Sequence, residues 1–158
     1  KVYMRQIVSQ LKKLNKTIAT MESCTGGAVV NSITNIEGAS DVLKFSAVTY
    51  SNDYKIKMGV SSDIIDKYSV YSIETADEMS KNISLFACSD YGVGITGKLN
   101  RIDKNNLYGE DNVVFISIYD SENDKFYHSE IVAVKNTREE NKELIINQII
   151  LMLHDVLF

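Results

Sequence analysis

The sequence contains no proline, only two cysteines and only two histidines among its 158 residues. Cys24 and Cys88 form no Cys-x-x-Cys pair, so they predict no disulfide framework, and they fit a reducing compartment such as the cytoplasm. His128 and His154 lie far apart, and the chain offers no recognisable spacing of zinc ligands. We therefore expect a cytoplasmic protein with neither a metal site nor a cofactor.

The charge pattern disfavours nucleic acid as a partner. The net charge is −4, acidic and basic residues are interspersed, and no basic block or ladder of aromatic and basic residues occurs. Residues 1–15 are charged and amphipathic, which is typical of neither a signal peptide nor a membrane span. No other segment is long and apolar enough to cross a bilayer, so we expect no membrane partner.

The composition predicts one compact domain over residues 1–158. Hydrophobic residues make up 44% of the chain and charged residues 24%, and neither a repeat nor a linker interrupts it. Helices and strands alternate at first, and a hairpin follows, which predicts a three-layer α/β/α sandwich with a mixed β-sheet. The patterns place helices at 2–14, 25–36, 52–59, 61–68, 72–90 and 137–158, and strands at 16–23, 45–51, 91–96, 112–120 and 125–134.

The stretch "TMESCTGG", residues 20–27, stands where a predicted strand meets a predicted helix. In α/β sheets such corners bind ligands, because helix starts offer unpaired N–H groups and glycines allow close approach to the backbone. The stretch would then supply an oxyanion hole and a nucleophile in Ser23. The alternative is that Ser23 and Thr25 only cap the helix and that Gly26 and Gly27 only turn the chain.

A serine nucleophile needs a base, and "YSNDYK", residues 50–55, offers one. Tyr50 is expected at a strand end, Asn52 at the cap of the next helix, and Lys55 in its first turn. The helix dipole and partial burial both favour the neutral form of a lysine there, which a general base requires. The alternative is a solvated Lys55 and a Tyr50 that serves packing.

Cys24 is a second candidate nucleophile, since it stands at the same predicted helix start. It would need His128 or His154 beside it, and nothing in the sequence pairs them. A buried structural thiol is the favoured interpretation of Cys24.

Two further stretches belong to the same predicted edge. "GITG", residues 94–97, ends a strand with Thr96 and Gly97, which again offer a hydroxyl and exposed amides. Arg138 opens the last helix and is suited to binding a phosphate, although a surface arginine would look the same in sequence.

These segments together resemble the C-terminal domain of the competence/damage-inducible CinA proteins, a family that includes nicotinamide mononucleotide deamidases. The resemblance covers roughly residues 3–155 in unchanged order. Its most specific element is Glu-Ser-Cys-Thr-Gly-Gly combined with Tyr-Ser-Asn-x-x-Lys, which begins 27 positions after the serine. The matching segments are "ATMESCTGGAVVNSITNIEGAS", "AVTYSNDYKIKMGV", "YSIETADEMS" and "VGITG".

The resemblance implies a three-layer sandwich and hydrolysis of the nicotinamide carboxamide to nicotinate mononucleotide and ammonia. It implies that Ser23 is the nucleophile and that Lys55, with Tyr50 as a relay, takes its proton. The residues expected to bind the nucleotide substrate are Glu22, Thr25, Gly26, Gly27, Asn52, Thr96, Gly97 and Arg138.

The segment after Gly97 departs from the family pattern. The family usually carries a loop of the type Ile-Ala-Gly-Pro-x-Gly, whereas residues 98–112 read "KLNRIDKNNLYGEDN" here. Lys98 and Arg101 are candidate substitutes for phosphate binding, and Lys142 stands where the family has a second arginine. An alternative is therefore a domain that binds a nucleotide or a protein partner without turnover. Apolar stripes on the two terminal helices predict a homodimer, unless they only cover the sheet.

Overall fold

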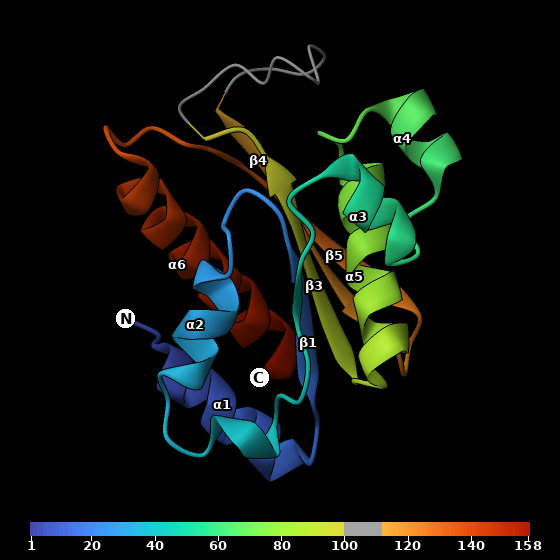
Figure 1. Ribbon diagram of the computed structural model, residues 1–158. Coiled ribbons are helices and arrows are strands. Elements are labelled where there is room, and N and C mark those ends of the chain that lie inside the picture. The colour runs from blue at the N-terminus through green and yellow to red at the C-terminus, as the bar shows by residue number, and fades with distance from the viewer. Residues whose placement is uncertain (100–111) are drawn as a thin grey trace.

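The computed structural model of the protein describes residues 1–99 and 112–158 (Figure 1). A five-stranded sheet lies between two layers of helices, in the order β2-β1-β3-β4-β5. Strands β2, β1 and β3 run parallel, whereas β4 and β5 continue the sheet antiparallel. This confirms the predicted three-layer α/β/α sandwich with a mixed sheet. The strands are β1 (Ile18–Glu22), β2 (Ala47–Val48), β3 (Tyr91–Gly97), β4 (Val113–Asp120) and β5 (Lys125–Val132).

The helices divide between the two faces of the sheet. One face carries α1 (Met4–Leu14), α2 (Ala28–Thr34) and α6 (Arg138–Leu157), and the other carries α3 (Asn52–Lys57), α4 (Ser62–Tyr68) and α5 (Ile73–Ala87) (Figure 1). A short 3-10 turn, Ala39–Asp41, links α2 to β2. Among the described residues, none of the helices combines the length and the apolar character that crossing a bilayer requires.

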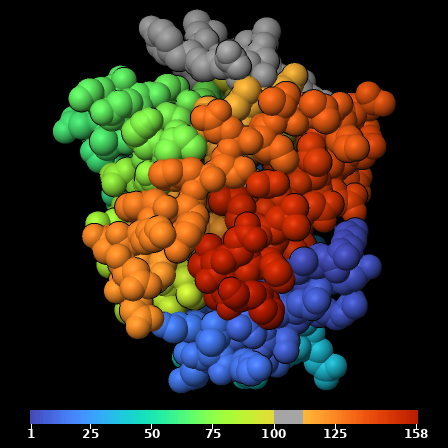
Figure 2. All heavy atoms as spheres, turned by 180° about the vertical axis from the view of Figure 1, so that it is seen from behind, coloured from blue at the N-terminus to red at the C-terminus, as the bar shows by residue number. Residues whose placement is uncertain are grey.

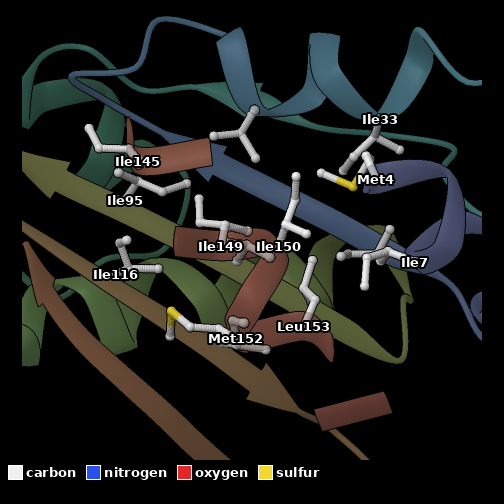
Figure 3. Close-up of a cluster of buried hydrophobic side chains, with 14 of the residues drawn as sticks. Met4, Ile7, Ile33, Ile95, Ile116, Ile145, Ile149, Ile150, Met152 and Leu153 are labelled. Carbon is white, nitrogen blue, oxygen red and sulfur yellow. The ribbon is translucent and has the colours of Figure 1, made fainter. Parts of the chain in front are cut away.

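The larger core lies between the sheet and the layer of α1, α2 and α6. Its side chains come from both terminal helices and from alternate positions of the strands, since successive strand residues point to opposite faces. The predicted apolar stripe of α1 is thus buried here. Figure 3 shows this cluster, including Met4, Ile7, Ile33, Ile95, Ile116, Ile145, Ile149, Ile150, Met152 and Leu153. From behind, α6 lies beside residues of β5 at the surface, with α1 next to its lower end (Figure 2).

The second face of the sheet packs very closely against α5. A Cβ atom built on Gly94 would lie 2.4 Å from the carbonyl oxygen of Ala76, and one built on Gly92 would lie 2.0 Å from that of Ser80. Only glycine allows the backbone of α5 to approach β3 at this distance. A smaller core of Ala19, Met21, Val60, Met79 and Ile83 fills the rest of this layer.

Several predicted boundaries need correction. The helix expected from residue 25 begins at Ala28, with Gly27 as its N-cap, because Thr25 bonds to a carboxylate and caps no helix. Ser51, and not Asn52, caps α3 by accepting a hydrogen bond from the amide of Tyr54. The strand expected over 45–51 is regular only at Ala47–Val48.

Candidate active site

The carboxyl ends of the three parallel strands meet at one edge of the sheet. Ser23 follows β1, and its amide donates to the carbonyl of Ile95 in β3 (3.1 Å). Thr49 follows β2, and its amide donates to the carbonyl of Glu22 at the end of β1 (2.7 Å). In Figure 1 this edge is where the chain leaves β1 for α2 and leaves β2 for α3. Such strand ends are the usual ligand-binding edge of an α/β sheet.

A hydrogen bond joins Ser23 to Lys55 at this edge. The two atoms, Ser23 Oγ and Lys55 Nζ, are 2.9 Å apart, and Nζ also donates to the carbonyl oxygen of Thr49 (2.6 Å). Lys55 is only 1% exposed and Ser23 only 8% exposed. Both groups are therefore shielded from solvent, and burial in general penalises the charged form of an amine.

Glu22 is fully buried, and its carboxylate organises the turn that carries Ser23. It accepts five hydrogen bonds, from the hydroxyls of Thr20 and Thr25 and from the amides of Gly27, Val29 and Val30. A negative charge at the start of α2 is also favoured by the helix dipole. Both oxygens accept hydrogen bonds from the protein itself and so hold the turn in place, whereas the expected substrate contact of Glu22 stays a prediction.

The glycines after Ser23 allow the chain to turn sharply into α2. Gly26 and Gly27 have φ values of 61° and 98°, a region that favours glycine. The amide of Gly26 donates to the carbonyl of Ser23 (3.0 Å), and the amide of Gly27 donates to Glu22 (3.2 Å). Within the part of the chain that the structure describes, the amides of Cys24 and Thr25 donate to no other residue, and that of Cys24 faces its own thiol.

Tyr50 and Arg138 meet at the rim of the site. Tyr50 is 65% exposed, and its hydroxyl accepts a hydrogen bond from Arg138 Nη2 (3.3 Å). Arg138 Nη1 donates to the carbonyl oxygen of Leu99, which follows β3. The arginine therefore links the segments after β2 and β3 with the start of α6. The role of Tyr50 as a proton relay stays a prediction.

Three further residues expected to contact the substrate are Thr96, Gly97 and Asn52. Thr96 is fully buried, and its hydroxyl donates to the carbonyl oxygen of Val70 (2.9 Å). A Cβ on Gly97 would lie 2.6 Å from the backbone of Val114, so this glycine permits the pairing of β3 with β4. Asn52 is half-buried as the first residue of α3.

Cys24 behaves as a buried structural thiol. Burial raises its pKa to about 12, although the nearby positive charges of Lys55 and Arg138 oppose this shift. A thiol with such a pKa carries almost no thiolate at neutral pH, and the thiolate is the reactive form. The geometry therefore supports the interpretation that the sequence favoured.

Two contacts were not foreseen from the sequence. Thr49 supplies the carbonyl that holds Lys55, and only its place before Tyr50 in the motif pointed to it. Lys142 reaches the glycine turn, since a Cβ on Gly26 would lie 3.5 Å from Lys142 Nζ.

Lys98 is buried with its ammonium 4.9 Å from the ring centre of Tyr71, whereas Arg101 and most of the altered 98–112 segment lie outside the described residues.

No group of three or more His, Cys, Asp or Glu side chains suited to holding a metal ion occurs in residues 1–99 and 112–158. What the arrangement offers chemically is a buried hydroxyl bonded to a buried amine, beside the backbone amides of Cys24 and Thr25, which donate to no other described residue.

Known proteins resemble this chain over its whole length. In solved structures, the competence/damage inducible protein CihA from Agrobacterium tumefaciens superposes with a TM-score of 0.86 at 25% identity, covering 96% of this chain and 92% of that one. A competence or damage-inducible protein from Enterobacter asburiae shares the fold with a TM-score of 0.89 at 18% identity, covering 100% of both chains.

Curated relatives are longer proteins. A CinA-like protein from Kosmotoga olearia is 42% identical over 92 residues, which make up 58% of this chain and 22% of that protein. The matched part covers 29% of a relative from Clostridium beijerinckii. The family model of the CinA C-terminal domain matches residues 1–157. The chain therefore belongs to the CinA C-terminal domain family.

Proposed function

We propose that the protein is an amidohydrolase that converts nicotinamide mononucleotide to nicotinate mononucleotide and ammonia. The observation that carries this proposal is the 2.9 Å hydrogen bond between Ser23 Oγ and Lys55 Nζ. A hydroxyl becomes a nucleophile when an adjacent neutral base accepts its proton, and a buried lysine is suited to that role.

The first half of the reaction forms an acyl-enzyme. Lys55 takes the proton of Ser23 while Ser23 Oγ attacks the carbonyl carbon of the carboxamide. The negative charge that develops on the carbonyl oxygen is stabilised by the backbone amides of Cys24 and Thr25. The protonated Lys55 then passes its proton to the amide nitrogen, the C–N bond breaks, and ammonia leaves.

The second half releases the product. Lys55 is neutral again and takes a proton from a water molecule, which attacks the ester carbonyl of the acyl-serine. Collapse of this intermediate returns the proton to Ser23 Oγ and frees the carboxylate of nicotinate mononucleotide. At the rim of the site, Arg138 is the group that we assign to the phosphate, since a guanidinium binds phosphate oxygens bidentately.

Ammonia release from nicotinamide mononucleotide tests this proposal. The unaltered protein is expected to release ammonia and to form one equivalent of nicotinate mononucleotide, whereas Ser23→Ala is expected to release none above background. Nicotinamide itself, which lacks the ribose phosphate, is expected to be a poor substrate. Equal release by the Ser23→Ala variant would exclude the mechanism.

The alternative function, nucleotide binding without turnover, is favoured by the altered 98–112 segment alone. Calorimetric binding of the mononucleotide without any product, under conditions where the protein is folded, would select this alternative over the amidohydrolase.

A further inference from the structure

The hydroxyl of Thr49 has no hydrogen-bond partner among the described residues, although it is buried. Thr49 is 2% exposed, and its backbone groups are both engaged, the amide with Glu22 and the carbonyl with Lys55. A buried hydroxyl without a hydrogen-bond partner lowers the stability of the fold and is rare in folded proteins. A role in binding a ligand would explain why it is there.

The pleat of the sheet places this hydroxyl on the same face as the reacting groups. Val48 pairs with Glu22, and the side chains of both lie toward the start of α2, since Val48 Cγ2 would be 3.6 Å from a Cβ on Gly27. Thr49 and Ser23 come directly after these strand ends, and the amide of each still donates to a neighbouring strand, so the alternation of a strand directs both side chains toward the opposite layer. That layer contains α3, which delivers Lys55 to Ser23.

We propose that the Thr49 hydroxyl binds the amide nitrogen of the scissile carboxamide. This inference rests on the proposed function and names the group that selects an amide. In the reaction Lys55 gives a proton to the leaving nitrogen, so this nitrogen must lie near Lys55 Nζ. The carbonyl of Thr49 accepts a hydrogen bond from Nζ, and strand alternation puts the Thr49 hydroxyl on the face of the sheet where Lys55 meets Ser23.

The chemistry of a primary carboxamide fits such an acceptor. Its nitrogen carries two N–H groups, which need acceptors once the substrate leaves water. The carbonyl of Thr49 is already used by Lys55, whereas the hydroxyl oxygen is not. An ester has no N–H at this position, so the Thr49 hydroxyl contributes to binding an amide and contributes nothing comparable to binding an ester.

Two variants and two substrates test the inference. Thr49→Val keeps the shape and removes the hydroxyl, and Thr49→Ser keeps the hydroxyl. The substrates are nicotinamide mononucleotide and the methyl ester of nicotinate mononucleotide. We expect Thr49→Val to lower kcat/KM about tenfold for the amide and less than about threefold for the ester, as the loss of one substrate hydrogen bond predicts. Thr49→Ser is expected to stay near the unaltered protein on both.

An equal loss on amide and ester, or no loss on the amide, overturns the role of Thr49 while leaving the amidohydrolase proposal intact. Absence of amide hydrolysis by the unaltered protein overturns both.

Thermal unfolding without ligand adds a readout that needs no activity. Thr49→Val is expected to keep or raise Tm by up to about 4 °C, because it removes an unpaired buried hydroxyl. A fall of several degrees would show that the hydroxyl is engaged in the unliganded fold, which contradicts the proposal.

Discussion

Lys55 Nζ lies 2.9 Å from Ser23 Oγ, although 32 residues separate the two in the sequence. The pairing of β1 with β2 makes this contact, because it brings the ends of both strands to one edge. The short helix α3 then turns Lys55 back over Thr49, whose carbonyl holds the amine. The contact therefore depends on the pairing of the two strands, and neither motif would produce it alone.

Replacing the buried lysine tests whether it is the base. Lys55→Met keeps much of the side-chain length and removes the amine, so we expect ammonia release to fall about 10²–10⁴-fold, the usual contribution of a general base. The fold is expected to persist, since an apolar side chain replaces a buried polar one. Steady-state kinetics with nicotinamide mononucleotide measures the loss.

Lys57→Met is the matched control, because Lys57 lies on the same helix and is exposed, with its ammonium 4.4 Å from the ring centre of Tyr54. It is expected to leave the rate within about twofold. Retention of more than a tenth of the activity by Lys55→Met would reject the lysine as the base.

The carboxylate of Glu22 is expected to matter for stability first. Glu22→Gln places an amide NH₂ group among five hydrogen-bond donors, so at least one buried donor loses its acceptor. We expect the free energy of unfolding to fall by roughly 2–3 kcal/mol. Urea denaturation measures this. The exposed Glu37→Gln serves as a control and is expected to change it by less than about 0.5 kcal/mol.

A change at Glu22 no larger than the change at Glu37 would mean that the turn holds without the charged acceptor. In that case its role would have to lie in contact with the substrate, as the sequence first suggested.

The sequence predicted the layers of the fold well, because apolar periodicity reports which face of a helix or strand is buried. It offered Lys55 as the base for Ser23 from its place at the start of a predicted helix, and the resemblance to the CinA family strengthened that pairing. The expectation that Thr25 caps a helix was wrong, since its hydroxyl donates to Glu22 and Gly27 is the N-cap of α2. Nothing in the sequence indicated the amides that donate to Glu22, since a glutamate that accepts backbone amides from the next helix looks like any polar residue in a turn. The hydrogen bond between Arg138 and Tyr50 spans 88 positions, and no local pattern reports such a contact.

The capping errors have one physical origin. Thr25, Asn52 and Ser51 are all good N-cap residues, so composition alone does not say which residue starts a helix. The three backbone amides that donate to Glu22 determine where α2 starts, and the Ser51 side chain determines where α3 starts.

The buried thiol of Cys24 predicts a pH dependence of stability. Its pKa is raised from 9.0 to about 12 by burial, so the unfolded chain loses this proton at lower pH than the folded one. The contribution of Cys24 is therefore complete below pH 9, and the free energy of unfolding falls as the pH rises from about 9 towards 12. Urea denaturation across this range, with Cys24→Ala as the control that lacks this titration, measures the effect.

The same thiol is expected to resist modification. At pH 8 a thiol reagent is expected to label the exposed Cys88 rapidly and Cys24 only after denaturant is added. Equal labelling rates for both cysteines in the folded protein would contradict the burial of Cys24 and reopen its candidacy as a nucleophile.

The close approach of α5 to β3 is expected to tolerate no added methyl group at Gly94. The Cβ of alanine would lie 2.4 Å from the carbonyl oxygen of Ala76 and 2.7 Å from the amide nitrogen of Ser80, and neither backbone atom can rotate away. Gly94→Ala is therefore expected to lower the free energy of unfolding by about 1–3 kcal/mol, the usual cost of overpacking. Urea denaturation with an unchanged m-value would assign the loss to stability of the folded state. A variant as stable as the unaltered protein would mean that α5 shifts outward at little cost. In that case α5 would not be a rigid support for the strand edge that holds Ser23.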